Sequence, residues 1–195
     1  MDSCSEKTLL ARIRNGDDSG FEALVVTHSP RTLALARRLT GNEEDAEDIS
    51  QDAFLRLHRH IGDFRGDSSV ATWLYRTVTR LAIDHLRRRK IRDRIFFFSN
   101  RSEDEDADIV DSAPASTPSP ADHYFAGEIR NRLELAMKRL SARQRVIFTL
   151  RHYEEMPLRD IAEMLDLGEG TVKSHLHRAV RILRKELKEL QEESS

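Results

Sequence analysis

The segment GDSSVATWLYRTVTRLAIDHLRRRK (residues 66–90) combines aromatic and arginine side chains at helical spacing. Guanidinium groups bind phosphate oxygens, and unpaired bases stack on aromatic rings for about 1–3 kcal/mol each. This mixture predicts contact with a single nucleic-acid strand, and the GDSSV loop offers a pocket for a flipped base. The residues expected in this contact are Phe64, Ser68, Trp73, Tyr75, Arg76, Arg80, Arg87 and Arg88, and Arg89 is also expected to follow the phosphate backbone.

An apolar stripe runs along the same helix through Val70, Leu74 and Val78. Such a stripe faces a protein core. Tyr75 therefore remains open to either role, as a core residue or as a DNA contact. Trp73 can serve both, with its ring half buried and its edge toward DNA.

A second segment, PLRDIAEMLDLGEGTVKSHLHRAVRIL (residues 157–183), has the pattern of a helix-turn-helix. Ile161 and Leu165 precede a tight turn, Val172 and Leu176 follow it, and the small Ala162 permits a close helix crossing. Polar side chains at the start of the second helix can donate to phosphates and to major-groove acceptors. These are Thr171, Lys173, Ser174, His175, His177 and Arg178. An amphipathic hairpin with a solvated basic face is the alternative interpretation.

The net charge of −2 conceals an uneven distribution. Residues 1–98 carry 17 basic and 15 acidic side chains, residues 99–121 carry one and six, and residues 122–195 carry 14 and 13. Residues 76–94 alone hold eight basic and two acidic side chains. The chain therefore has a basic patch suited to nucleic acid, which the whole-chain charge does not reveal.

The stretch SNRSEDEDADIVDSAPASTPSPA (residues 99–121) predicts a flexible linker, because it is acidic, rich in Ser, Ala and Pro, and without an apolar period. Residues 95–98 come nearest to a strand and are too short to pair. The sequence thus predicts an all-α protein with two small helical domains, residues 1–98 and 122–195. Helices are expected at residues 5–15, 19–39 (with a kink or a break at Pro30), from 42 onward, 67–90, 121–139, 142–153, from 157 onward, and 170–190.

Several classes of function are excluded by composition. Cys4 is the only cysteine among 195 residues, so no internal disulfide can form. The pairs His58/His60 and His175/His177 are spaced two apart and point to different helix faces, so no metal site and no cofactor are expected. No phosphate loop or nucleophile motif indicates an enzyme, and no catalytic residue is proposed. No apolar run could cross a bilayer and no secretory signal is present, so a cytoplasmic protein is expected.

Two long motifs resemble the sigma-70 family, in particular the extracytoplasmic-function (ECF) group of bacterial RNA polymerase sigma factors. DAEDISQDAFLRLHRHIGDFRGDSSVATWLYRTVTRLAIDHLRRRK is similar to sigma region 2, and LSARQRVIFTLRHYEEMPLRDIAEMLDLGEGTVKSHLHRAVRILRKEL is similar to region 4. The resemblance implies a non-enzymatic subunit that binds the clamp helices and flap of core polymerase and directs it to promoter DNA.

The same resemblance assigns roles to residues. The polymerase-docking positions are Asp48, Gln51, Asp52 and Leu55; the aromatic and basic set of residues 64–88 reads and melts the −10 element; the polar set of residues 171–178 reads the −35 element. It also implies an anti-sigma partner, a stress or envelope response, and weak promoter binding by the free chain.

Four positions depart from the family pattern. Arg80 replaces a small polar base reader, Asp166 and Gly168 replace the usual Gly and Ser of the turn, and His175 stands where arginine is common. The −10 and −35 preferences therefore cannot be carried over from relatives. A stand-alone helix-turn-helix regulator, which would need a palindromic target and affinity without polymerase, is the alternative function.

Overall fold

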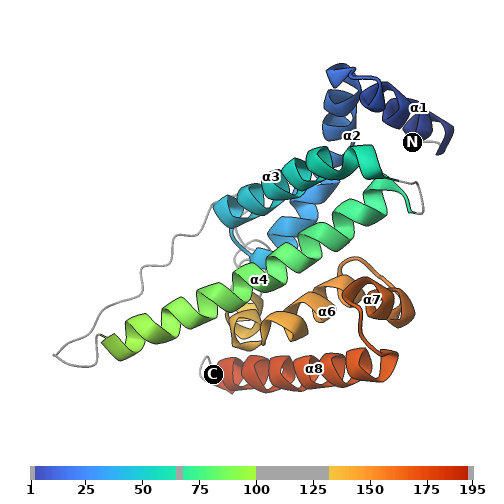
Figure 1. Ribbon diagram of the computed structural model, residues 1–195. Helices are drawn as coiled ribbons and strands as arrows, with labels where there is room; N and C mark the ends of the chain where they lie inside the picture. Colours follow the sequence, from blue (N-terminus) through green and yellow to red (C-terminus); the bar gives the residue numbers. More distant parts are fainter. Residues whose placement is uncertain (1–2, 65–67, 100–131, 193–195) are drawn as a thin grey trace, which may run out of the picture.

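The computed structural model describes residues 3–64, 68–99 and 132–192, which form helices and short turns without a strand. The helices are α1 (Ser3–Arg14), α2 (Asp18–Thr40), α3 (Glu43–His60), the 3-10 turn η1 (Ile61–Asp63), α4 (Val70–Ser99), α6 (Ala142–His152), α7 (Leu158–Leu165) and α8 (Glu169–Glu192); residues 132–139 are also helical. The all-α prediction is confirmed. Figure 1 shows α4 between two layers, with α2 and α3 on one side and α6, α7 and α8 on the other.

Local signals set the ends of the first helices. Gly16 follows α1 with φ 81°, as expected for a left-handed cap. The side chain of Asn42 accepts a hydrogen bond from the Asp45 backbone N–H (2.9 Å) and caps α3, whose first turn is acidic. Pro30 lies inside α2, which continues through it as one helix, so two shorter helices do not form.

The helix α4 begins later and ends later than the sequence predicted. The Ser69 hydroxyl accepts from the Thr72 N–H (3.1 Å) and so caps the first turn. The helix then continues to Ser99 and includes residues 95–98, whose apolar run looked nearest to a strand. Gly66 and Asp67 of the GDSSV loop, and residues 100–121 of the expected linker, lie outside the described residues.

The second half follows its sequence signals closely. Ser141 and Gln144 form a reciprocal capping box at the start of α6. Pro157 is the N-cap of α7, whereas the sequence predicted it as the first residue inside this helix. Asp166 adopts the left-handed conformation (φ 55°, ψ 52°), which an Asp tolerates, and this residue makes the sharp turn into α8.

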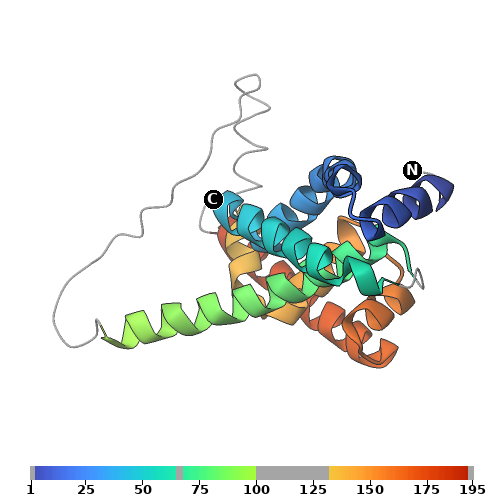
Figure 2. The ribbon, with the colours of Figure 1, turned by 45° about the horizontal axis from the view of Figure 1, so that its top comes forward.

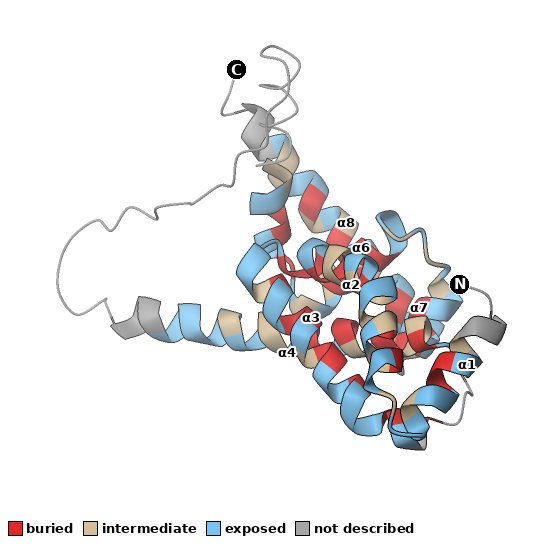
Figure 3. Ribbon diagram, turned by 90° about the horizontal axis from the view of Figure 1, so that it is seen from above, coloured by how far each residue is buried: buried red, intermediate tan, exposed pale blue. Residues whose placement is uncertain are grey.

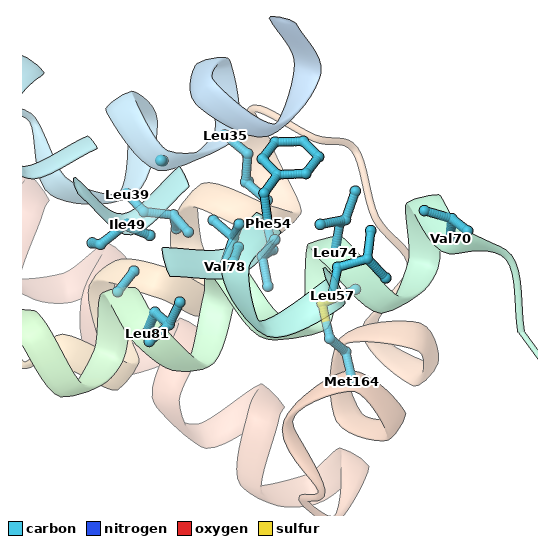
Figure 4. Packing of buried hydrophobic residues seen from close by; sticks show 14 of the residues in the cluster. Leu35, Leu39, Ile49, Phe54, Leu57, Val70, Leu74, Val78, Leu81 and Met164 are labelled. Atoms are coloured by element: carbon cyan, nitrogen blue, oxygen red, sulfur yellow. The ribbon is translucent and has the colours of Figure 1, made fainter. Parts of the chain in front are cut away.

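One apolar cluster joins the two halves. Figure 4 shows Met164 of α7 pointing toward Leu57 and Leu74 in the core formed by α2, α3 and α4. Val146 and Ile147 of α6 are fully buried in the same cluster. A second, smaller cluster packs residues 132–140 against Ala179 and Leu183 of α8. The two helical units are therefore packed against each other rather than held apart.

Candidate nucleic-acid interface

The helix α8 presents its polar side chains to solvent. Val172 and Ala179 are fully buried and fix one face of the helix against the protein. The opposite face carries a shallow groove, and the four side chains that line it are exposed: Lys173, Ser174, His177 and Arg178. Thr171 is exposed beside them, so the arrangement can donate several hydrogen bonds to one side of a duplex.

Electrostatics on α8 favour a cationic surface with one neutral imidazole. The Lys173 ammonium pairs with the Glu169 carboxylate one turn earlier (2.8 Å), and this hydrogen bond lowers the pKa of Glu169. His175 is half-buried, and burial lowers its pKa, as do the positive charges of Arg143 and Arg178. The lowered pKa favours the uncharged form of the His175 imidazole.

The aromatic residues expected to contact DNA, one before α4 and two on it, lie at two depths. Phe64 is buried in the core at 9% exposure. Trp73 and Tyr75 are half-buried and pack against the core cluster. Trp73 and Tyr75 are therefore held by the core and remain partly exposed, so that a ligand could reach them.

The basic residues of α4 divide along its length. Arg80, Arg87 and Arg88 are exposed, and the C-terminal end of α4 extends beyond the other helices (Figures 2 and 3). Arg89, by contrast, pairs with Asp45 of α3 (3.3 Å). Arg76 pairs with Glu163 of α7 (2.6 Å). Within the described residues, Arg80, Arg87 and Arg88 therefore form no ion pair, whereas Arg76, one turn from Trp73 along α4, has a carboxylate partner.

Contacts around Tyr75 had no signal in the sequence. Its hydroxyl donates to Glu154, at the end of α6 (2.8 Å), and accepts from Arg31 of α2 (3.1 Å). The Arg31 guanidinium lies over the Tyr75 ring, 5.3 Å from its centre. Arg38 of α2 forms an ion pair with the same Glu154. Burial raises the pKa of Tyr75, and the hydrogen bond to Glu154 also raises it.

Two side chains of α1 brace the turn before α4, and sequence analysis missed both. The Glu6 carboxylate accepts from the Val70 backbone N–H (2.9 Å), and the Arg14 guanidinium donates to the Phe64 carbonyl. They hold the two sides of the segment between Phe64 and Val70. Ser68, within that segment, is half-exposed.

The expected docking residues lie on one side of α3. Asp48 and Gln51 are exposed, and Leu55 is an exposed apolar side chain at 50%. Asp52 binds Arg56 one turn later through both carboxylate oxygens (3.3 and 3.1 Å). Protein–protein interfaces have an apolar centre and a polar rim, and Leu55 with its charged and polar neighbours would fit such an arrangement.

A shallow depression of about 240 Å³ connects this side of α3 with α4. Its lining includes Asp48 and Asp52 from α3 and His85, Arg88 and Arg92 from α4. In the part of the chain that the structure describes, no group of three or more His, Cys, Asp or Glu side chains is placed to hold a metal ion. Within the same residues, no helix is long and apolar enough to span a bilayer.

Family models match both helical units. The Sigma-70 region 2 model matches residues 24–91, and the Sigma-70, region 4 model matches residues 130–183. The chain is 30% identical over 184 residues to the ECF RNA polymerase sigma factor SigW of Bacillus subtilis, covering 94% of this chain and 97% of the relative. It is 31% identical over 191 residues to the RNA polymerase sigma-H factor of Pseudomonas aeruginosa, with 97% of each chain covered.

Two solved structures share the fold. The sigma factor RpoE from Bartonella quintana, solved in complex with the anti-sigma factor NepR, has a TM-score of 0.58 at 24% identity, with 86% of this chain and 96% of that chain covered. CnrH, solved in complex with the cytosolic domain of CnrY, has a TM-score of 0.57 at 20% identity, with 94% and 97% covered.

Proposed function

This chain belongs to the ECF group of sigma-70 RNA polymerase sigma factors, and on that premise we propose that it directs core polymerase to promoters and initiates transcription there. The observation that carries the proposal is that one chain contains two helices with different surfaces, each suited to a different form of DNA. One is an exposed polar helix, α8, and the other is a helix with half-buried rings and a projecting basic end, α4.

The α8 surface is proposed to bind the −35 element as duplex. Lys173 and Arg178 contact phosphates or base acceptors, and Thr171, Ser174 and His177 are in reach of the same groove. His175 is neutral and half-buried, so it contributes packing or one polar contact rather than charge.

The α4 surface is proposed to read the −10 element after the strands separate. Trp73 and Tyr75 supply stacking surfaces, while Arg80, Arg87 and Arg88 follow the phosphate backbone. Phe64 is buried in the same core cluster as Val70 and Leu74 of α4, and Ser68, two residues before α4, is half-exposed. Glu6 and Arg14 act as positioning residues, because they hold the chain on both sides of the turn.

The side of α3 with Asp48, Gln51, Asp52 and Leu55 is proposed to dock on the clamp helices, with a second contact between region 4 and the flap. The chain acts without chemistry of its own, in the cytoplasm where core polymerase works. An anti-sigma factor is the proposed inhibitor, because the structural neighbour from Bartonella quintana was solved in complex with the anti-sigma factor NepR. Failure of any product of neighbouring genes to bind the co-expressed chain would contradict that part of the proposal.

Run-off transcription tests the function. Core polymerase is incubated with and without this chain on a promoter library from the source genome, and transcripts are sequenced. We expect transcripts that depend on the chain and share one −35/−10 pair. Failure to bind core polymerase, together with binding to a palindromic duplex, would instead support the stand-alone regulator.

A further inference from the structure

The basic residues of α4 lie on two sides of the helix. Side chains three, four or seven positions apart share one side, and successive positions point about 100° apart. Arg76, Arg80 and Arg87 follow this spacing and so share one side. Arg92 lies on a different side, because it follows Arg87 by five positions. That second side lines the depression shared with α3 and carries Leu81, His85, Arg88 and Arg92.

The depression, of about 240 Å³, lies between α3 and α4, which run side by side (Figure 1). Its α3 wall is formed by Asp48 and Asp52, two of the four residues proposed to dock on core polymerase. Ile49 and Leu81 also line it and are 5% and 6% exposed. The lining therefore combines apolar surface with charges of both signs, and it is continuous with the proposed docking surface.

Contacts at Asp45 fix the two walls relative to each other. The Asp45 carboxylate, in the first turn of α3, pairs with the Arg89 guanidinium of α4 (3.3 Å). Nε2 of His85, which lines the depression, lies 3.1 Å from the same carboxylate oxygen. Asp45 and His85 are both half-buried. The α4 wall is therefore held against α3 by a polar contact that is partly withdrawn from solvent.

Opposite charges line the depression without neutralising each other. Within the described residues, no ion pair joins a lining residue of α3 to a lining residue of α4. Asp52 pairs instead with Arg56 of its own helix (3.1 Å). Asp48 and Arg92 are exposed. A partner that offers a cation to Asp48 and a carboxylate to Arg92 would complete both pairs.

We infer that the docking surface for core polymerase spans α3 and α4, and that Arg92 is a polymerase contact within it. The occupant of the depression is the pair of clamp helices, with a carboxylate against Arg92 and a basic side chain against Asp48. Asp45 is a positioning residue, because it holds the α4 wall in place. Arg88 lines the same depression and is next to Arg87 in the chain, so it is available to polymerase as well as to DNA. The inference rests on the proposed function of α3 as the docking helix.

A matched pair of charge reversals tests the inference. Arg92→Glu reverses a charge in the depression, and Arg94→Glu makes the same change two positions later, on the other side of α4; both residues are exposed. Affinity of the full chain for immobilised core polymerase of the source organism is measured without DNA, so that no DNA contact contributes. We expect Arg92→Glu to bind at least about tenfold more weakly than Arg94→Glu. Asp48→Lys is the positive control for docking through α3.

The positioning role of Asp45 is tested by coupling. Asp45→Asn removes the charge that holds His85 and Arg89. We expect it to weaken binding to core polymerase about threefold in the wild-type chain and to have no further effect in the Arg92→Glu chain. A merely structural loss would be equal in both backgrounds, and that result would overturn the positioning role.

A photoreactive side chain identifies the occupant. The chain with Arg92→p-benzoylphenylalanine is irradiated in complex with core polymerase, again without DNA, and the crosslinked peptide is identified by mass spectrometry. We expect a peptide of the clamp helices that contains an acidic residue. Arg94→p-benzoylphenylalanine is the control and should not capture that peptide. A crosslink from position 92 to another part of polymerase, or no crosslink, would contradict the assignment.

Failure of the inference differs from failure of the function. If Asp48→Lys weakens binding to polymerase while Arg92→Glu and Arg94→Glu bind alike, docking is confined to α3 and the inference is wrong. If the wild-type chain does not bind core polymerase at all, the proposed docking function itself is wrong.

Discussion

The two surfaces proposed to bind DNA, on α4 and α8, differ in how the fold presents them. On α8, the buried residues Val172 and Ala179 hold the helix against the protein. The side chains on the opposite face are exposed to solvent, and Lys173 among them pairs with Glu169 of the same helix. On α4, the same residues that would meet DNA also contact the rest of the protein. Tyr75 packs against the core and binds Glu154, and Arg76 binds Glu163.

This difference matches the state of the DNA that each reader meets. A duplex groove exists before the protein arrives, so a rigid exposed helix can bind it directly. An opened strand exists only after melting, and the α4 residues Tyr75 and Arg76, which are proposed to bind it, also contact Glu154 and Glu163.

The largest expected effect concerns the core that α4 shares with the second unit. Leu74→Ala should lower the free energy of unfolding by about 3 kcal/mol, because Leu74 is almost fully buried in the joint cluster. Urea unfolding is monitored in two ways, by the fluorescence of Trp73, the only tryptophan, and by circular dichroism of the helices. The two signals should report one coincident transition.

Leu183→Ala, in the smaller cluster away from α4, serves as the control for that experiment. Two separate transitions in the wild-type chain, with only the fluorescent one shifted by Leu74→Ala, would mean that the units unfold independently. The second unit would then not be packed on α4 in solution.

A glycine at the end of α2 gives a smaller and more specific test of the packing between the two helical units. Gly41 has φ 68°, and a Cβ added there would lie 2.5 Å from Nη2 of Arg145. Gly41→Ala should cost about 1–2 kcal/mol for the left-handed conformation, plus a further cost because the guanidinium must move. The free energy of unfolding measures both contributions together.

Gly16→Ala isolates the backbone contribution, since Gly16 has φ 81° and no atom within 4 Å of an added Cβ. The excess cost of Gly41→Ala over Gly16→Ala should disappear when Arg145→Ala is also present. If the excess persists in that background, Arg145 of the second unit does not lie against Gly41 in solution.

The caps and turns at helix ends could be predicted from the sequence. Asn42, Ser141, Gly16 and Asp166 act within their own helix ends, so their local signals were sufficient to place caps and turns. The outward face of α8 followed from its apolar period in the same way.

Contacts between distant residues left no local pattern. Glu6 binds the Val70 N–H 64 residues away, and Tyr75 binds Glu154 79 residues away. Glu154 in particular lies among ordinary surface residues in the sequence, and only tertiary packing makes it a buried partner of Arg38. The length of α4 was also underestimated, because an apolar run at residues 95–98 fits a helix as well as a strand.

A change of about 1 kcal/mol in the free energy of duplex binding is expected for a substitution on the exposed face of α8. Lys173→Ala should weaken binding to the −35 duplex at all sequences alike and reduce the slope of log affinity against log salt by about one. Glu169→Gln, which frees the same lysine from its carboxylate partner, should act in the opposite direction. A sequence-dependent loss with an unchanged salt slope would indicate that Lys173 reads a base instead.

The smallest effect is a dependence of stability on pH. Burial lowers the pKa of His28 and of His175 below 6.5, so the unfolded chain binds protons there that the folded chain does not. The free energy of unfolding should therefore fall as pH decreases from about 6.5 to about 5, above the ordinary range of carboxylates. His28→Gln should flatten this decrease, and an unchanged slope would contradict the contribution of His28.

The division of labour between the two readers is tested most directly by a crossed binding measurement. Holoenzymes carrying wild-type chain, Trp73→Ala or Arg178→Ala are titrated with two probes, a −35 duplex fragment and a single-stranded −10 fragment. We predict that Trp73→Ala weakens binding only to the single strand, and that Arg178→Ala weakens binding only to the duplex. Equal losses on both probes for both variants would contradict the account, because neither helix would then have a reader role of its own.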